Sequence, residues 1–254
     1  MKNDLIINTS KRIPVLLCLD VSPSMSLHHR MDDLNNAIRL LYQELSKDVR
    51  VANAVDLAIV TFSTEVTASD FETLDILEDK VFEPVEEGGT NLSEAVLTAI
   101  AMLESRTAEL RNYQIPYYLP FFILVTDGNP DQDDQDDMER EQLNRAVQAV
   151  RRHCEWSEGA DNLIAPYIIG VGEEVVEEIL NRFASQFTGQ AIILGDEARQ
   201  RDLFRDLFLF IGNSVRFSVG ANVRDLKGLY QKIQKDTMRK VKSVLIHNRD
   251  NPVS

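Results

Sequence analysis

Cysteine is scarce in this chain of 254 residues, which contains Cys18 and Cys154 alone. Two cysteines do not build the disulfide framework on which small extracellular domains rely. Cys18 lies in an apolar run, where we expect it to pack in the core, and Cys154 lies in a predicted helix, where we expect a semi-buried structural thiol. Long hydrophobic runs are also missing: no stretch reaches the ~20 apolar residues of a membrane-spanning helix, and the first residues hold no apolar signal core. These absences predict a cytoplasmic protein with no membrane association.

Positive charge is in deficit as well. The chain has 27 Lys and Arg against 41 Asp and Glu, which gives a net charge of −14. Such an excess repels phosphate over most of the surface, so we expect no nucleic-acid partner. Residues 221–254 are the exception, since they hold eight basic and three acidic side chains, a net charge of +5 against −19 for residues 1–220.

This basic end of the chain has a helical pattern. A helix from about residue 225 to residue 245 would place five apolar side chains near one face: Leu226, Leu229, Ile233, Val241 and Leu245. The pattern favours an amphipathic docking helix over a nucleic-acid arm. Linkers rich in Gly, Pro or Ser, internal repeats and low-complexity segments are all missing. The simplest division is therefore a domain at residues 1–220 and a basic amphipathic extension at residues 221–254.

Apolar runs and amphipathic stretches alternate along the chain. Continuous apolar runs are typical of strands covered on both faces. We expect strands at 13–19, 55–62, 120–126, 163–172 and 191–194, with a short edge strand near 65–69 and an irregular segment at 70–89. We expect helices at 31–45, 92–110, 138–154, 173–186 and 197–219. This alternation predicts an α/β fold of the doubly wound, Rossmann-like class, with a mostly parallel central sheet and helices on both faces.

Oxygen-bearing side chains gather at the ends of these elements. "DVSPS" follows the first strand, "GGTN" precedes the second long helix, and "TDG" ends a third buried strand. Ligands of open parallel sheets bind beyond the carboxyl ends of the strands, so we expect the three segments to converge. Together they supply two carboxylates and three hydroxyls, and neither His nor Cys: Asp20, Ser22, Ser24, Thr90 and Asp127.

All-oxygen ligation with limited negative charge suits a hard divalent cation, and magnesium in particular. Alternate residues of an extended segment point the same way, so "DVSPS" can direct three oxygens toward one ion. Gly88 and Gly89 allow a close approach of the backbone beside Thr90. The sequence therefore predicts a metal site.

The three segments, in this order and with these separations, resemble the metal-ion-dependent adhesion site of von Willebrand factor type A (VWA) domains. The resemblance covers roughly residues 13–219. It implies a bound Mg²⁺ or Mn²⁺, with Ca²⁺ less expected, whose remaining coordination position accepts a carboxylate from a partner protein.

The same resemblance implies a role for each site residue. Ser22 and Ser24 would bind the ion directly and Thr90 directly or through water, whereas Asp20 and Asp127 would act mainly through water or as hydrogen-bond acceptors behind the ligands. The sequence departs from the commonest pattern at residue 23, where a proline stands in place of a frequent glycine. Proline stiffens the loop and removes no ligand.

The compact layout also resembles the TerY-like branch, which is associated with tellurite resistance. The resemblance lies in the opening strand, in "LVTDGNP" and in the Phe-rich helix "LFRDLFLFIGNSV". It implies a non-enzymatic module that binds a partner bearing an acidic residue, in the company of kinases, phosphatases or stress-response proteins. The oligomeric state is left open.

Simpler interpretations stay open for each site residue. Asp20 and Asp127 can cap a turn or a helix, Ser22 and Ser24 can serve turn chemistry, and Thr90 can cap the helix that follows it. The two adjacent histidines at 28 and 29 are expected to be exposed residues at the rim of the site, and the acidic run at 131–137 is expected to be a solvated loop.

An enzyme is the alternative function, namely a magnesium-dependent phosphotransferase or hydrolase with Asp20 as its nucleophile. Ser22 stands where a haloacid-dehalogenase-like enzyme would need a second aspartate. The chain also lacks a phosphate-cradling glycine loop and a Gly-x-Ser-x-Gly elbow. A binding module is therefore the favoured prediction.

Overall fold

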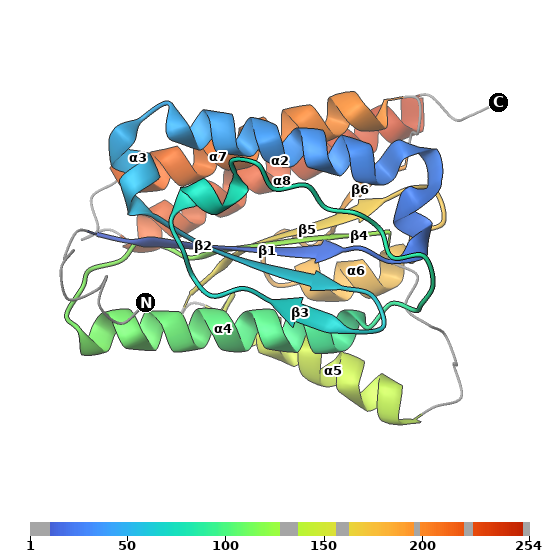
Figure 1. Ribbon diagram of the computed structural model, residues 1–254, viewed down its shortest axis with the longest axis horizontal. Coiled ribbons are helices and arrows are strands. Elements are labelled where there is room, and N and C mark those ends of the chain that lie inside the picture. Colours follow the sequence, from blue (N-terminus) through green and yellow to red (C-terminus); the bar gives the residue numbers. More distant parts are fainter. Residues whose placement is uncertain (1–10, 128–136, 156–162, 196–198, 221–225, 251–254) are drawn as a thin grey trace.

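A mostly parallel sheet crosses the middle of the computed structural model, which describes residues 11–127, 137–155, 163–195, 199–220 and 226–250. Within these ranges six strands follow the order β3-β2-β1-β4-β5-β6 (Figure 1). The strands are β1 (Ile13–Asp20), β2 (Val55–Phe62), β3 (Val66–Ala68), β4 (Phe121–Thr126), β5 (Ala165–Val171) and β6 (Ile192–Leu194). β3 runs antiparallel to β2 and every other pairing is parallel, which confirms the predicted sheet.

Helices cover both faces of the sheet (Figure 1). One face carries α2 (Arg30–Ser46), α3 (Val49–Ala54), α7 (Gln200–Gly220) and α8 (Leu226–Asp250). The other face carries α4 (Leu92–Asn112), α5 (Asp137–Arg152) and α6 (Glu177–Ala184). Two 3₁₀ helices, η1 (Pro23–His29) and η2 (Leu74–Leu77), lie in the connections. The doubly wound, Rossmann-like class is thereby confirmed.

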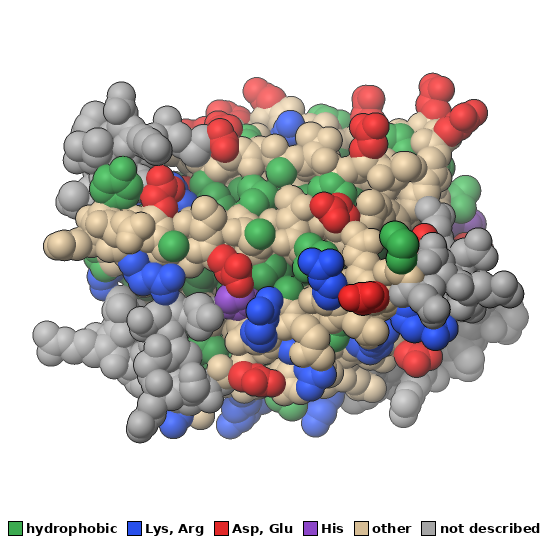
Figure 2. All heavy atoms as spheres, turned by 90° about the horizontal axis from the view of Figure 1, so that it is seen from below, with side chains coloured by type: hydrophobic (Ala, Val, Ile, Leu, Met, Phe, Trp, Pro, Cys, Tyr) green, Lys and Arg blue, Asp and Glu red, His purple; other side chains and the backbone are tan. Residues whose placement is uncertain are grey.

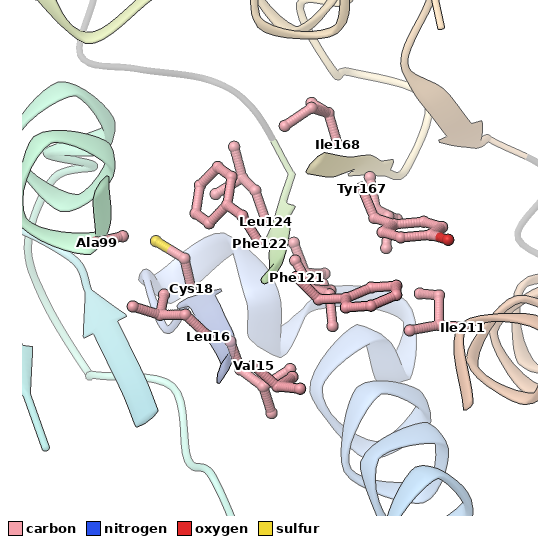
Figure 3. Close-up of a cluster of buried hydrophobic side chains, with 14 of the residues drawn as sticks. Val15, Leu16, Cys18, Ala99, Phe121, Phe122, Leu124, Tyr167, Ile168 and Ile211 are labelled. Carbon is pink, nitrogen blue, oxygen red and sulfur yellow. The ribbon is translucent and has the colours of Figure 1, made fainter. Parts of the chain in front are cut away.

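The central strands are apolar up to their last residues, Asp20 and Thr126, because helices cover them on both sides. All eight residues of β1 and all six of β4 are buried. Figure 3 shows Cys18 pointing toward Ala99 of α4, while Phe121 and Tyr167 point toward Ile211 of α7. The rings of Phe121 and Tyr167 stack with their centroids 5.9 Å apart. Both cysteines are free thiols and buried, as predicted for Cys18, whereas Cys154 is buried more deeply than predicted.

Helix α8 packs as part of the main hydrophobic core. It contributes five buried side chains: Leu229, Tyr230, Ile233, Val241 and Val244. The hydroxyl of Tyr230 donates to the backbone carbonyl of Cys154 at 2.8 Å, and the Gln234 amide donates to the carbonyl of Phe187 at 2.8 Å. The amphipathic face of this helix therefore docks onto its own chain. The division at residue 220 stays a prediction, but the two parts share one core.

Local structure differs from the predicted elements in a few places. α3 was not predicted, because six residues are too few to show a helical period; Asp48 caps it by accepting from the backbone N–H of Arg50 at 2.9 Å. The irregular segment at 70–89 contains η2. α6 starts at Glu177 and not at residue 173, because the chain first turns at Gly172, where φ is +92°.

Parts of the predictions lie outside the described residues, namely most of the acidic run at 131–137 and the side chains of Leu226 and Leu245. None of the helices in the described ranges is both long and apolar enough to cross a membrane.

The direction in which the chain adds strands reverses between β1 and β4. The chain continues from β1 toward β2 on one side, and from β4 toward β5 on the other. Connections that leave the carboxyl ends of such a strand pair diverge and form the crevice where doubly wound folds bind ligands. Asp20 ends β1, Thr126 ends β4, and Leu19 pairs with Val125 in the register between them. The fold thus places two of the predicted site segments side by side.

Candidate metal centre

Asp20 lies where the strand order reverses, at the end of β1. Its side chain is fully buried at the end of β1. Oδ1 accepts a hydrogen bond from the backbone N–H of Ser22 at 2.8 Å, and Oδ2 accepts one from the hydroxyl of Thr126 at 2.6 Å. Since Thr126 belongs to β4, the second bond joins the two strands at the reversal point. Asp20 therefore holds its orientation through contacts on both sides.

The loop after Asp20 brings two serine hydroxyls together. The chain turns into η1 with Pro23 in its first turn, where a missing backbone N–H is tolerated. The oxygen atoms of Ser22 and Ser24 lie 3.0 Å apart. Ser22 is buried, whereas Ser24 is half-buried and closer to solvent. Two neutral oxygens thus converge beside a buried carboxylate.

Thr90 reaches the same edge of the sheet from the loop that precedes α4. The backbone N–H of Val85 donates to the carbonyl of Val21, just beyond the end of β1, at 2.8 Å. The N–H of Gly89 donates to the hydroxyl of Thr64, just beyond the end of β2, at 2.6 Å. These bonds hold the loop against the ends of β1 and β2, and the Thr90 side chain is buried there.

Asp127 directly follows β4 and is buried. Its Oδ2 accepts a hydrogen bond from the guanidinium of Arg30 at 3.2 Å, and both side chains are buried. Its Oδ1 is buried and has no hydrogen-bond partner among the described residues, although the Ser24 hydroxyl lies close enough to lower the pKa of the carboxyl. A buried carboxylate oxygen without a donor is unfavourable, so this atom is suited to a cation.

The electrostatics of the two carboxylates also favour a cation. Burial, followed by the charge of Asp127, raises the pKa of Asp20 to about 6, although hydrogen bonds to its two oxygens oppose the shift. Burial likewise raises the pKa of Asp127, against the lowering effects of the Ser24 hydroxyl and the Arg30 guanidinium. Both ionised carboxylates are destabilised in the protein alone, and a divalent cation would supply the charge that they lack.

The donor chemistry fits a hard cation. In the described part of the chain, no group of three or more His, Cys, Asp and Glu side chains gathers to hold a metal. The candidate centre instead combines two carboxylates with hydroxyl groups, a set of oxygen donors that suits Mg²⁺ or Mn²⁺. Neutral hydroxyls neutralise little of the charge of an ion and leave it able to attract a further anion.

Two residues of the centre were missed in the sequence. Thr126 lies inside the "TDG" segment and donates to Asp20, and the signal was its place as the last residue of a predicted strand. Arg30 carries no comparable signal, because a basic residue at the start of a helix is ordinarily solvated. The histidines at 28 and 29 are exposed, as predicted, and both have positive φ, +50° and +62°.

A separate groove lies away from this centre. It has a volume of about 710 Å³, runs between α5 and α6, and is lined by side chains that include Asn144, Arg151 and Arg182. Figure 2 shows basic side chains over the lower half of the face seen there and acidic side chains along its upper margin. The predicted site residues do not line this groove.

The model of the von Willebrand factor type A domain family matches residues 15–206, about three quarters of the chain. The chain belongs to this family. VWA domains are often protein-interaction modules. α8 lies beyond the matched residues, although it shares the core of the VWA domain.

Several solved structures have the same VWA fold. A von Willebrand factor type A protein from Catenulispora acidiphila is 17% identical, with a TM-score of 0.54, and the match covers 79% of this chain and 42% of that chain. The PilB minor pilin from Streptococcus sanguinis is 16% identical, with a TM-score of 0.54, and the match covers 81% of this chain and 62% of that chain. The pilus adhesin SpaC from Lactobacillus rhamnosus GG is 11% identical, with a TM-score of 0.55, and the match covers 82% of this chain and 31% of that chain.

This chain therefore spans less than two thirds of the length of each of these proteins, and at such identities the likeness concerns the fold. A search of the curated proteins finds no match.

Proposed function

We propose that this VWA protein is a non-enzymatic binding module that captures a partner carboxylate through a bound Mg²⁺ or Mn²⁺. The observation that carries the proposal is the convergence of oxygen atoms at the reversal point between β1 and β4. There the charge of Asp127 lies close enough to raise the pKa of Asp20, and the hydroxyls of Ser22 and Ser24 lie 3.0 Å apart beside the two carboxylates.

Each residue has a distinct part in this proposal. Ser22, Ser24 and Thr90 would hold the cation with neutral oxygens, while Asp20 and Asp127 would supply negative charge directly or through water. When bound, the cation supplies an electrophilic position for one oxygen of an incoming carboxylate. The hydrogen bonds from Ser22 and Thr126 keep Asp20 from rotating, so the centre is preorganised before the partner arrives.

The enzymatic alternative is less well supported. A nucleophilic carboxylate needs an oxygen that can approach the substrate. Asp20 is fully buried, and each of its oxygens already accepts a hydrogen bond. Such a group suits a fixed structural role around a cation better than an attack on phosphorus or carbon.

The proposal also covers the location of the protein and the chemistry of its partner. We place the protein in the cytoplasm, in a stress-response or signalling assembly of the kind that the TerY-like resemblance implies. The partner bears an accessible Asp or Glu side chain and includes neither nucleic acid nor membrane. Because the net charge of −14 repels an acidic partner, the cation would have to supply the local attraction for the partner carboxylate.

Removal of the two serine hydroxyls tests the proposal. We expect the double variant Ser22→Ala/Ser24→Ala to bind Mn²⁺ at least 30-fold more weakly than the natural protein, because each lost ligand weakens a site of few donors. Isothermal titration with MnCl₂ measures the affinity. Ser26→Ala is the matched control, since Ser26 lies in the same loop but is exposed and donates to the carbonyl of Pro23.

Equal Mn²⁺ affinity in the double variant and the control would refute the proposed ligands. The same proteins then serve in a pull-down from the native host in Mg²⁺ and in EDTA. We expect a partner that is retained in Mg²⁺ and lost both in EDTA and with the double variant.

A further inference from the structure

Arg30 occupies an unusual position for a basic residue. It is the first residue of α2, yet only 2% of its side chain is exposed. Its Nη1 atom donates to Oδ2 of Asp127 at 3.2 Å. A buried guanidinium is unfavourable unless it serves a nearby anion, so its placement beside a predicted site residue calls for a reason.

The end of β5 fixes the position of this guanidinium. Gly172 has φ of +92°, a conformation that other residues rarely adopt, and a Cβ atom there would overlap the guanidinium of Arg30. The backbone N–H of Gly172 donates to the carbonyl of Leu194 at 3.0 Å, which anchors the segment to β6. The backbone therefore leaves space for a planar group at this point and holds it against Asp127.

The net charge of the buried side chains decides how strongly the candidate centre attracts a cation. Asp20 and Asp127 contribute two negative charges and Arg30 one positive charge, so these three side chains together carry −1. Among the described residues, Glu174 is exposed and Asp33 is paired with Arg201 at 2.9 Å. A divalent cation would change the local charge to +1, which one carboxylate would neutralise.

We infer that Arg30 sets the charge of the cation site, and thereby makes the site weak for the cation alone and dependent on one added carboxylate. The inference rests on the proposed function and assigns to it a residue that acts through Asp127. Without Arg30 the centre would carry −2, and a divalent cation alone would neutralise it. The site would then have no net positive charge to attract a partner carboxylate. The loss would be large, because charges interact strongly where little water surrounds them.

Two substitutions at this position test the inference. We expect Arg30→Gln to bind Mn²⁺ at least tenfold more tightly than the natural protein in chloride buffer. Arg30→Lys retains the positive charge and is expected to stay within threefold of the natural protein. Titration calorimetry with MnCl₂ gives the affinities, and thermal unfolding in EDTA checks that each variant is folded. A merely structural role for Arg30 would weaken Mn²⁺ binding in both variants.

Acetate provides a second measurement that requires no variant. We expect the natural protein to bind Mn²⁺ more tightly in sodium acetate than in sodium chloride of the same ionic strength, after correction for Mn²⁺–acetate pairing. The increase in Mn²⁺ affinity caused by acetate should be smaller in Arg30→Gln.

The outcomes separate the two proposals. If the natural protein binds Mn²⁺ but acetate gives no gain, or folded Arg30→Gln binds no more tightly, the role of Arg30 is refuted and the cation site stands. If the natural protein binds no Mn²⁺ in chloride or in acetate, the proposed function fails together with this inference.

Discussion

Replacement of Asp20 by asparagine is expected to stabilise the metal-free protein at neutral pH and to abolish its stabilisation by Mg²⁺. The ionised side chain is buried beside Asp127, and its pKa lies near 6 in place of 3.8. At about 1.4 kcal/mol per pKa unit, ionisation of Asp20 opposes folding by an amount on the order of 3 kcal/mol at pH 7. Asparagine removes the charge but keeps the shape, so we expect a net gain of about 1 to 3 kcal/mol.

The pH dependence of this effect has a definite sign. Because the pKa of Asp20 is raised in the folded state, its contribution to stability is full below the unfolded value of about 4. That contribution is lost as the pH rises through about 6. In EDTA, the free energy of unfolding of the natural protein should therefore fall relative to that of Asp20→Asn between pH 4 and pH 7. Urea denaturation at several pH values measures the difference.

Mg²⁺ should reverse the order of the two proteins. The cation favours the ionised carboxylate, so it should raise the melting temperature of the natural protein and leave that of Asp20→Asn unchanged. Asp32→Asn is the control, because Asp32 lies on the nearby α2 with 70% of its side chain exposed. If Asp20→Asn is less stable than the natural protein in EDTA and still gains stability from Mg²⁺, then Asp20 is neither destabilised by its charge nor needed for cation binding, and the prediction is wrong.

Loss of α8 is expected to have the largest effect on folding. The helix contributes five buried apolar or aromatic side chains to the main core, and its removal exposes the surface beneath them. We expect a chain that ends at Gly220 to lose cooperative thermal unfolding, because burial of a single large apolar side chain contributes about 1.5 to 3 kcal/mol. Circular dichroism during heating measures the loss.

Single substitutions in α8 give a graded version of this test. Ile233 is 3% exposed, so Ile233→Ala should lower the free energy of unfolding by about 2 to 5 kcal/mol. Lys235 lies on the same helix but is exposed, and Lys235→Ala should change it by less than about 0.5 kcal/mol. Equal stability of the two variants, or unchanged unfolding of the truncated chain, would show that α8 is dispensable for the VWA core.

The fold was largely predictable because its central strands are buried on both faces. The runs at 13–19 and 120–126 are continuously apolar, and strands of this kind occur inside sheets covered by helices. α3 was not predictable, since a six-residue helix shows too little periodicity. The pattern of α8 was visible, but its packing into the main core depends on contacts such as that of Tyr230 with Cys154, 76 residues away in the sequence.

The candidate site was predictable only where a residue ends an element. Asp20 and Asp127 follow apolar strands, and the reversal of strand order brings them to one crevice. Arg30 was missed, because its role depends on the space that Gly172 leaves at the end of a distant strand. Local sequence around Arg30 indicates a helix start and contains no trace of that contact.

Diffraction from a crystal of the natural protein soaked in MnCl₂, recorded above the manganese absorption edge, tests the proposed cation centre most directly. We expect an anomalous peak in the crevice between β1 and β4, at bonding distance from the hydroxyls of Ser22 and Ser24 and adjacent to Thr90 and Asp127. An ordered crevice with no anomalous peak at saturating Mn²⁺, or a peak bound elsewhere on the molecule, would contradict the proposed centre.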